Sequence, residues 1–270
     1  MTAALAEDIG PGDATARALL PDEMPGRARI EARQELVVCG LEVAREVFAR
    51  RGVQIDVRGS DGARAAPGEV LAYVHGPAVE ILAGERTALN FLQRLSGVAT
   101  HTSRHVECVR GTRARVVDTR KTTPGWRALE KYAVRCGGGD NHRMGLYDGI
   151  LIKDNHIAAL GSVGEAVKRA RERAPFGLRV QVEVESVDAA RDAIAAGAHA
   201  LLVDNQPPAV IRQVVELAGG RVEVEASGGV TLANLAAIAA CGVDRISIGA
   251  LTHSAPAVDL ALEWEGISSS

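Results

Sequence analysis

Val180-Gln-Val-Glu-Val-Glu185 is a short run of alternating β-branched and polar residues, and similar runs return along the chain. The runs from residue 180 onward begin about 20 to 23 residues apart, the length of one strand, one helix and two short loops. Between them stand helix signals such as Ser162-Val-Gly-Glu165, which predicts a capping box. Strands that alternate with helices predict a parallel sheet, and six such units favour a closed barrel over a doubly wound sheet. The predicted strands are Arg115–Asp118, Ile150–Lys153, Val180–Glu185, Ala200–Asp204, Val222–Ala226 and Arg245–Gly249.

The first 110 residues lack this repeat and predict a separate α/β sandwich domain. Its predicted strands are Arg27–Arg33, Leu36–Cys39, Val53–Arg58 and Glu69–Val74, and its predicted helices are Leu41–Arg50 and a long one from Ala78 past Phe91. We therefore expect an N-terminal α/β sandwich domain over residues 1–110 and an open, seven-stranded-like α/β barrel as the catalytic domain over 111–270. This division leaves room for a last helix to pack back on the first domain.

Composition excludes several classes of function. The chain has 270 residues, 47% of them hydrophobic and 24% charged, which is typical of a folded globular protein. Its 31 basic and 34 acidic residues give a net charge of −3, and its aromatic content is 3%, so a nucleic-acid surface is not indicated. The four cysteines show no C-x-x-C pair, and no apolar run approaches the length of a membrane span. We expect a cytoplasmic protein without nucleic-acid or membrane partners.

Two adjacent cations follow the first predicted barrel strand. Arg120 and Lys121 stand in Asp118-Thr-Arg-Lys-Thr-Thr-Pro-Gly125, at the strand's carboxyl end, where barrels build their sites. Lysine is scarce here, with only four in the chain, so each lysine is worth inspecting. Arginine grips carboxylate or phosphate bidentately and lysine adds a point charge, so the pair predicts an anion clamp. The alternative is a solvated loop.

A glycine-rich segment and a strand-end lysine form a second group of candidates. Gly137–Gly139 permit close backbone approach to a ligand, although such runs are also common in plain flexible turns. His142 and Arg143, which follow, are two donors suited to an anionic ligand. Lys153 ends an apolar strand, where packing explains an ammonium group poorly.

Acidic residues alternate along two predicted strands. Gln181, Glu183 and Glu185 are expected to point into the barrel, and Glu223 and Glu225 repeat the pattern. With Asp204 at a further strand end, such acids can hold Mg²⁺, accept sugar hydroxyl groups or stabilise a developing cation. The alternative is a set of internal ion pairs with Arg120, Lys121 and Lys153.

Small residues end the last two strands. Ser227-Gly-Gly229 and Ser247-Ile-Gly249 occupy the place where barrel enzymes commonly bind a phosphate group. A tight turn explains either glycine alone, but two in succession favour a phosphorylated substrate. His253 is then either a phosphate donor or a helix cap.

Taken in order, these motifs resemble the quinolinate phosphoribosyltransferase family of type II phosphoribosyltransferases. The resemblance covers essentially the whole chain. It implies transfer of phosphoribosyl from phosphoribosyl pyrophosphate to quinolinate, with loss of CO₂ and release of nicotinate mononucleotide and pyrophosphate, a step of NAD biosynthesis. The motifs are Glu7–Asp13, Glu85–Asn90, Arg94–Gly97, Asp118–Gly125, Gly137–Leu146, Ile150–His156, Val182–Ser186, Leu202–Asn205, Glu225–Gly229 and Ile246–Ser254.

The resemblance also implies roles for single residues and an assembly. Lys121, Lys153, Glu183 and Asp204 would be catalytic, and Glu183 and Asp204 would face the ribose and Mg²⁺, directly or through water. A homodimer is implied in which Arg86 reaches the site of the neighbouring subunit. The dicarboxylate would be bound by Arg86, Arg120, His142, Arg143 and Lys153. The pyrophosphate would be bound by Lys121 and His253, and the 5′-phosphate would be bound by Ser227, Gly228 and Gly249.

Three rival interpretations stay open on the sequence. A related family found with molybdate transport operons shares many of these motifs, and turnover of quinolinate distinguishes it. A class I aldolase would use Lys153 as a Schiff base, which borohydride trapping would reveal. A regulator that only binds phosphosugars would release no pyrophosphate, and the intact cationic and acidic sets argue against it.

Overall fold

The computed structural model describes residues 1–266, so residues 267–270 of the predicted barrel domain lie outside it. The described chain forms two compact units. Unit 1 comprises residues 1–101, 135–138 and 255–266, and unit 2 comprises residues 102–134 and 139–254. The chain passes from unit 1 to unit 2 after residue 101, within a helix, and the end of the described chain belongs to unit 1.

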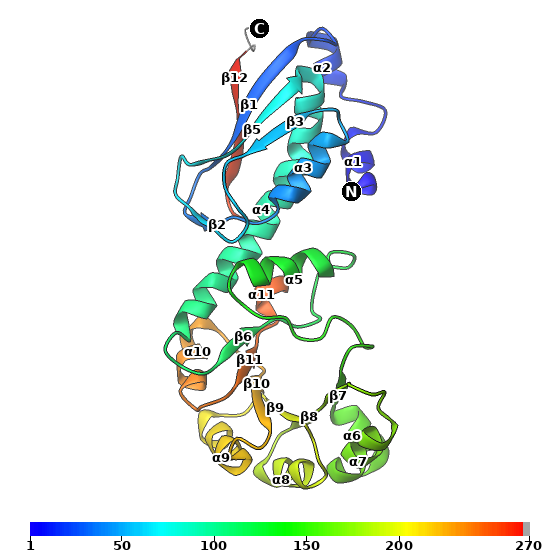
Figure 1. Ribbon diagram of the computed structural model, residues 1–270, viewed down its shortest axis with the longest axis vertical. Coiled ribbons are helices and arrows are strands. Elements are labelled where there is room, and N and C mark those ends of the chain that lie inside the picture. Colours follow the sequence, from blue (N-terminus) through cyan, green and yellow to red (C-terminus); the bar gives the residue numbers. More distant parts are fainter. Residues whose placement is uncertain (267–270) are drawn as a thin grey trace. The chain divides into compact units, whose positions relative to one another are not determined.

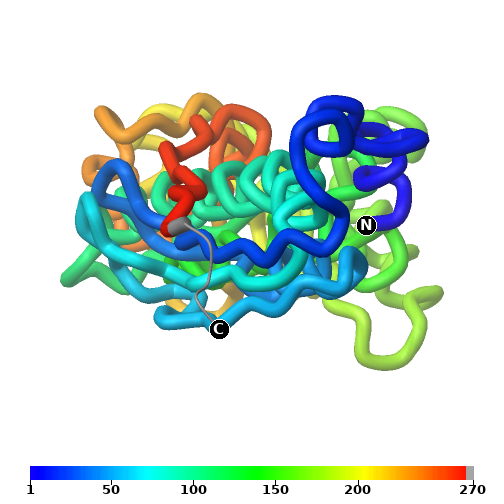
Figure 2. Tube along the Cα trace, turned by 90° about the horizontal axis from the view of Figure 1, so that it is seen from above, coloured from blue at the N-terminus to red at the C-terminus, as the bar shows by residue number. Residues whose placement is uncertain are grey.

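Unit 1 contains a four-stranded antiparallel sheet in the order β12-β1-β5-β3. Figures 1 and 2 both show the last strand, in red, beside the first, in blue. Ala28 and Ile30 of β1 are fully buried, as expected for alternate residues of a strand with one covered face. A two-stranded ribbon, β2 (Leu36–Val37) with β4 (Arg64–Ala65), completes the unit's strands. The sheet consists of β1 (Pro25–Ala32), β3 (Gln54–Val57), β5 (Val70–Pro77) and β12 (Leu260–Gly266).

The last described element is a strand, so the expectation of a last helix that packs back was wrong. Leu260-Ala-Leu-Glu-Trp-Glu265 alternates apolar and other side chains with period two, a strand signal that the sequence analysis missed. β12 pairs with β1 over Leu260–Gly266, and this pairing holds the segment in unit 1.

Four helices belong to unit 1 or begin there. The Asp13 carboxylate caps the second of them by accepting hydrogen bonds from the backbone N–H groups of Thr15 (2.9 Å) and Ala16 (3.0 Å). The fourth is 31 residues long and buries Ile81, Ala88, Leu92 and Leu95 at helical spacing. It confirms the predicted long helix and continues into unit 2. The helices are α1 (Thr2–Ile9), α2 (Ala14–Leu19), α3 (Leu41–Ala49) and α4 (Ala78–Cys108).

Unit 2 is built on a six-stranded parallel sheet in the order β6-β11-β10-β9-β8-β7. Each strand lies within one residue of the predicted start, and the barrel-type architecture is confirmed. The six strands are the six that the sequence predicts for a seven-stranded-like barrel, and a parallel bridge also joins Val117 of β6 to Asp140. The strands are β6 (Arg115–Val117), β7 (Ile150–Ile152), β8 (Val180–Val184), β9 (Ala200–Asp204), β10 (Glu223–Ser227) and β11 (Arg245–Ser247).

The helices between these strands begin where the sequence places their caps. The Ser162 hydroxyl accepts a hydrogen bond from the Glu165 backbone N–H at 3.1 Å, as the predicted capping box requires. Figure 1 shows α6 to α9 on one side of the arc formed by β7 to β10. Because all six strands run parallel, their carboxyl ends share one edge, where the predicted site residues meet. The helices are α5 (Arg127–Cys136), α6 (Asp154–Leu160), α7 (Val163–Arg173), α8 (Val187–Ala195), α9 (Pro208–Ala218), α10 (Leu232–Ala239) and α11 (Ala250–His253).

Among residues 1–266 there is no helix whose length and apolar character would let it cross a bilayer.

Candidate active site

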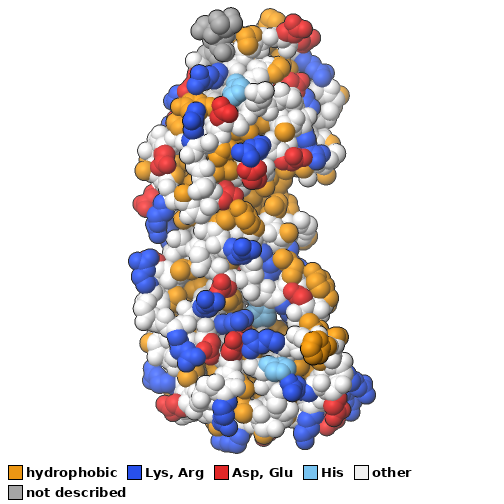
Figure 3. All heavy atoms as spheres, in the orientation of Figure 1, with side chains coloured by type: hydrophobic (Ala, Val, Ile, Leu, Met, Phe, Trp, Pro, Cys, Tyr) orange, Lys and Arg blue, Asp and Glu red, His pale blue; other side chains and the backbone are white. Residues whose placement is uncertain are grey.

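A cavity of about 270 Å³ opens at the carboxyl ends of the unit 2 strands. Figure 3 shows basic, acidic and histidine side chains gathered over this part of unit 2. Arg86 is the one predicted residue in unit 1, where it is exposed on α4. The predicted residues that line the cavity are Arg120, Lys121, His142, Arg143, Lys153, Asp204 and Ser227.

The cationic part of the cavity is formed by Arg120, Lys121 and Arg143. Burial and then the nearby Arg120 guanidinium lower the pKa of Arg143, while Asp148 acts in the opposite direction. The Arg143 guanidinium donates a hydrogen bond to the Gly149 carbonyl oxygen at 2.8 Å. Within the described chain, Arg120 and Lys121 make no ion pair. Like charges without acidic partners favour an anionic ligand, so the solvated-loop alternative explains this arrangement less well.

His142 is held on both sides of its ring. Its Nδ1 accepts a hydrogen bond from the Arg143 backbone N–H at 2.8 Å, which leaves Nε2 as the protonated nitrogen. Nε2 lies 3.1 Å from Gln181 Oε1 and 3.4 Å from Glu225 Oε2. Both ring nitrogens are therefore engaged by the protein, so a direct contact with a ligand carboxylate requires His142 to exchange one of these partners.

A buried ion pair, Lys131 with Asp118, supports the loop that carries His142. Lys131 is 1% exposed and Asp118 is fully buried. Asp118 also accepts hydrogen bonds from the His142 backbone N–H (2.8 Å) and the Asn141 side-chain amide (2.6 Å). Burial raises the pKa of Asp118 despite these contacts, because the desolvation of its carboxylate outweighs them. Neither residue was predicted to support the site, although the scarcity of lysine marks Lys131 for inspection.

A second buried acid fixes the loop after β6. Glu130 accepts hydrogen bonds from the Thr123 backbone N–H at 2.9 Å and from the Thr123 hydroxyl at 2.8 Å. The Arg127 guanidinium donates to the neighbouring Thr122 hydroxyl at 3.0 Å. Helix α5 therefore positions the segment that carries Arg120 and Lys121. No motif pointed to this role for Glu130.

Lys153 and Asp204 also line the cavity, and Glu183 adjoins it through Lys153. The Lys153 ammonium nitrogen lies 2.6 Å from Glu183 Oε2, so the internal ion-pair interpretation holds for these two residues. Asp204, at the end of β9, is half-buried and lines the cavity. Glu185 is exposed beyond the end of β8, so the expectation that it points into the barrel was wrong. Glu223 pairs with Arg179 at 3.0 Å and Arg245 at 3.5 Å, which is a structural role.

Glu225 lies inside the barrel, where it is 2% exposed. Its Oε2 accepts a hydrogen bond from the Gln181 amide at 3.0 Å, and the same oxygen faces His142. Burial alone would raise the pKa of Glu225, but contacts with His142, Ser247 and Gln181 together lower it. The carboxylate therefore stays ionised and orients both Gln181 and His142.

Glycines bring the last two strand ends close to their neighbours. Gly228 has φ +86°, and a Cβ there would lie 2.7 Å from the Asn205 backbone nitrogen. A Cβ at Gly249 would lie 2.9 Å from Lys121 Cδ and 3.2 Å from His253 Nε2. The structure thus brings Gly249 and His253 close to Lys121, which lines the cavity.

Two family models match this chain, one for each domain. The model of the quinolinate phosphoribosyl transferase N-terminal domain matches residues 13–96, and that of the C-terminal domain matches residues 98–263. The chain is 47% identical over 259 residues to a probable nicotinate-nucleotide pyrophosphorylase [carboxylating] of Bacillus subtilis, covering 95% of this chain and 89% of that protein.

A further relative and a solved structure match nearly the whole chain. The nicotinate-nucleotide pyrophosphorylase [carboxylating] of Mycobacterium leprae is 43% identical over 268 residues, covering 96% of this chain and 94% of that protein. The solved structure of the nicotinate-nucleotide pyrophosphorylase from Francisella tularensis superposes with a TM-score of 0.93 at 40% identity, covering 98% of this chain and 94% of that one. With both domain models matched along nearly its whole length, the chain belongs to the quinolinate phosphoribosyl transferase family.

Proposed function

We propose that this protein performs the reaction for which its relatives are named: it transfers phosphoribosyl from phosphoribosyl pyrophosphate to quinolinate and releases CO₂ and pyrophosphate, giving nicotinate mononucleotide for NAD biosynthesis. The observation that carries the proposal is the division of one cavity into a cationic part and an acidic part. Arg120, Lys121, Arg143 and Lys153 line the first, and Asp204 lines the second. Glu183 does not line the cavity itself and adjoins it through its ion pair with Lys153. Both substrates are anions, and the reaction develops positive charge between them.

The cationic part suits the two carboxylates of quinolinate. Arg120 and Arg143 are guanidinium groups that lie close together, and each can bind a carboxylate through two parallel hydrogen bonds. Lys153 is half-exposed at the end of β7 and adds a third charge. We assign the dicarboxylate to these three residues and to His142, which first has to give up a bond to Arg143 or Gln181.

The acidic part suits the ribose. Transfer from a pyrophosphate leaving group gives the anomeric carbon oxocarbenium character, which a fixed carboxylate stabilises without reorganising. Glu183 is 8% exposed and held by Lys153, so it is positioned in advance. We assign Glu183 and Asp204 to the ribose hydroxyl groups and the developing charge.

A magnesium ion fits the same acids. Mg²⁺ usually keeps several waters and binds through one or two carboxylates together with substrate phosphates. Asp204 is half-buried, lines the cavity and makes no ion pair among the described residues. We propose that Asp204 and Glu183 hold Mg²⁺, directly or through water, where the ion would neutralise the pyrophosphate charge.

The corner at Lys121 suits the phosphates. Lys121 and His253 approach Gly249 closely, and we assign these two residues to the pyrophosphate. Ser227, Gly228 and Gly249 stand at the ends of the last two strands, and we assign them to the 5′-phosphate. After transfer, the quaternised ring nitrogen accepts the electron pair left by decarboxylation, so that step needs no additional cofactor.

We propose that the active unit is a homodimer with shared sites. Arg86 is exposed on α4 in unit 1, whereas every other assigned residue belongs to unit 2. In a two-fold dimer each subunit would lend its Arg86 to the dicarboxylate site of the other.

The test is a pyrophosphate-release assay with quinolinate beside nicotinate. We expect turnover of quinolinate and a strong preference over nicotinate, since a single carboxylate leaves cationic groups unpaired at a cost of about 1–3 kcal/mol. Pyrophosphate release without turnover of quinolinate would favour the molybdate-operon relative, and binding without release would favour a regulator. Borohydride trapping of a carbonyl substrate on Lys153 would instead indicate a class I aldolase.

A further inference from the structure

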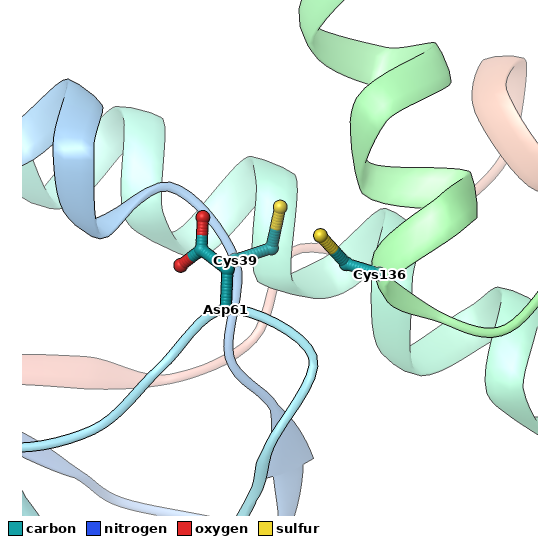
Figure 4. Close-up of side chains that lie close together, drawn as sticks. All are labelled: Cys39, Asp61 and Cys136. Carbon is teal, nitrogen blue, oxygen red and sulfur yellow. The ribbon is translucent and has the colours of Figure 1, made fainter.

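Two cysteines far apart in the sequence meet in unit 1. Cys39 follows β2 and is fully buried, while Cys136 ends α5 and is half-buried. The two sulfur atoms and a carboxylate oxygen of Asp61 all lie within 4.8 Å of one another. Figure 4 shows the Cys39 and Cys136 thiol groups pointing toward one another. The proposed transfer reaction uses none of these three residues.

The protein holds both cysteines in place. The Cys39 backbone N–H donates to the Ser96 hydroxyl of α4 at 2.9 Å, and that hydroxyl donates to the Cys39 carbonyl oxygen at 3.1 Å. Gly62, next to Asp61, lies close to Cys136, because a Cβ at Gly62 would lie 3.5 Å from the Cys136 carbonyl oxygen. Backbone contacts therefore position both cysteines, so the approach of the two sulfur atoms does not depend on flexible side chains alone.

We propose that Cys39 and Cys136 form a reversible disulfide when the protein meets a low-molecular-weight disulfide. The Cys136 thiolate attacks one sulfur of the small disulfide and expels the first thiol, which leaves a mixed disulfide on Cys136. The Cys39 thiol then loses its proton and attacks the Cys136 sulfur, which expels the second thiol. Two protein thiols lose two electrons and two protons, and the small disulfide becomes two thiols.

The difference in solvent exposure between Cys136 and Cys39 sets the order in which the two cysteines react. Cys136 is half-buried and can be reached from solvent, whereas Cys39 is inaccessible. Hydrogen bonding to Cys136, burial and the Asp61 charge all raise the pKa of Cys39, so it stays a thiol until the mixed disulfide forms beside it. Cys39 thus acts as the resolving cysteine.

A metal ion is the competing occupant of this cluster. Structural zinc sites use four protein ligands, and this group offers three. One of them, Asp61, already accepts hydrogen bonds from the Gly40 N–H (3.0 Å) and the Leu41 N–H (3.1 Å) at the start of α3. The carboxylate is therefore engaged as a helix cap, and the two sulfurs remain as the reactive pair.

The experiment treats the full-length protein with an excess of oxidised glutathione and maps its disulfides by peptide mass spectrometry. We expect a peptide pair linked through Cys39 and Cys136. In Cys108→Ser, which lacks the exposed thiol, we expect a loss of two of the three thiols titrated after denaturation. The link closes a long loop, so the midpoint of thermal unfolding should rise by roughly 5–10 °C and return on reduction.

Variants separate this pair from ordinary surface oxidation. Cys39→Ala and Cys136→Ala should each abolish the linked peptide and the rise in the unfolding midpoint, and Cys136→Ala should also prevent the mixed disulfide. Cys108→Ser removes an exposed cysteine outside the pair and should leave both signals intact. Absence of the linked peptide in the wild-type protein would overturn the proposal. So would one tightly bound zinc ion per purified chain that is lost in Cys39→Ala, since the group would then be a metal site.

Discussion

The Lys153 ammonium nitrogen lies 2.6 Å from Glu183 Oε2, and this contact joins the two parts of the candidate site. Lys153 comes from the end of β7 and Glu183 from the neighbouring β8, so parallel pairing of the strands brings them together. The lysine side chain is 48% exposed and the glutamate side chain 9%, so the cation faces the cavity and the acid supports it from within. A ligand carboxylate that binds Lys153 would share this cation with Glu183.

Glu183→Gln and Asp204→Asn should each lower kcat by about 10²–10³ while leaving the Kd for quinolinate within a few-fold of wild type. The reason is that both acids are assigned to the ribose and metal, where charge develops during transfer. Steady-state kinetics and calorimetric titration of quinolinate separate the two effects. Glu185→Gln is the matched control, because this glutamate is exposed beyond the same strand and should change neither quantity. Loss of quinolinate binding with an unchanged kcat would place the acids in the wrong part of the cavity.

Arg86→Ala and Lys121→Ala should each be nearly inactive alone and should restore activity when their subunits are mixed. A heterodimer would contain one site that combines an intact Lys121 with an Arg86 lent by the other subunit. Random pairing makes about half of the dimers mixed, each with one complete site of two, so roughly a quarter of wild-type activity should return. The measurement is initial rate after subunit exchange, with exchange shown independently by tagged chains.

The control for this mixing experiment is Arg45→Ala, which removes an exposed arginine paired with Glu42 in unit 1. Arg45→Ala should be active alone. When it is mixed with Lys121→Ala, the activity should not exceed that of the sites whose Lys121 is supplied by the Arg45→Ala chains. If exchange is complete and Arg86→Ala with Lys121→Ala recovers nothing, Arg86 does not act across subunits.

The sequence predicted the barrel strands well because each has a local signature. β-branched alternation repeats at a fixed interval, and Ala200–Asp204 was placed to the residue. The ends of the strands also predicted that Arg120, Lys153 and Asp204 would line one cavity, since parallel strands share an edge. These inferences required only the period and direction of the elements.

The supporting contacts could not be predicted because they join residues without a local signal. Lys131 lies on an amphipathic helix and pairs with Asp118, which ends a strand thirteen positions earlier. Cys39 and Cys136 meet only through tertiary packing, and their spacing resembles no known motif. β12 was missed for a different reason: its alternating pattern lies beyond the last βα unit, where a helix was expected.

Lys131→Met should lower the free energy of unfolding by about 3–5 kcal/mol, because it leaves the Asp118 carboxylate buried without its partner. The Asn141 side-chain amide and the His142 backbone N–H both donate to the same carboxylate, so the KM for quinolinate should rise as well. Urea unfolding and steady-state kinetics provide the two measurements. Lys168→Met, an exposed lysine on α7, is the control and should stay within about 0.5 kcal/mol of wild type. Equal stability of Lys131→Met and Lys168→Met would show that the buried pair contributes little.

Glu225→Gln should lower stability at neutral pH by about 1–3 kcal/mol, and this difference should shrink in acid. The pKa of Glu225 is lowered in the folded protein from its ordinary value of 4.5, so the folded state favours the carboxylate. Such a group stabilises the fold fully above pH 4.5 and loses its contribution as the pH falls through the lower, folded-state value. Urea unfolding of both proteins between neutral pH and the acid limit of folding measures the difference. Glu216→Gln on the exposed surface of α9 is the control and should show no comparable pH-dependent gap. A gap for Glu225→Gln that widened in acid would mean that burial, and not the contacts with His142, Ser247 and Gln181, dominates at this carboxyl group.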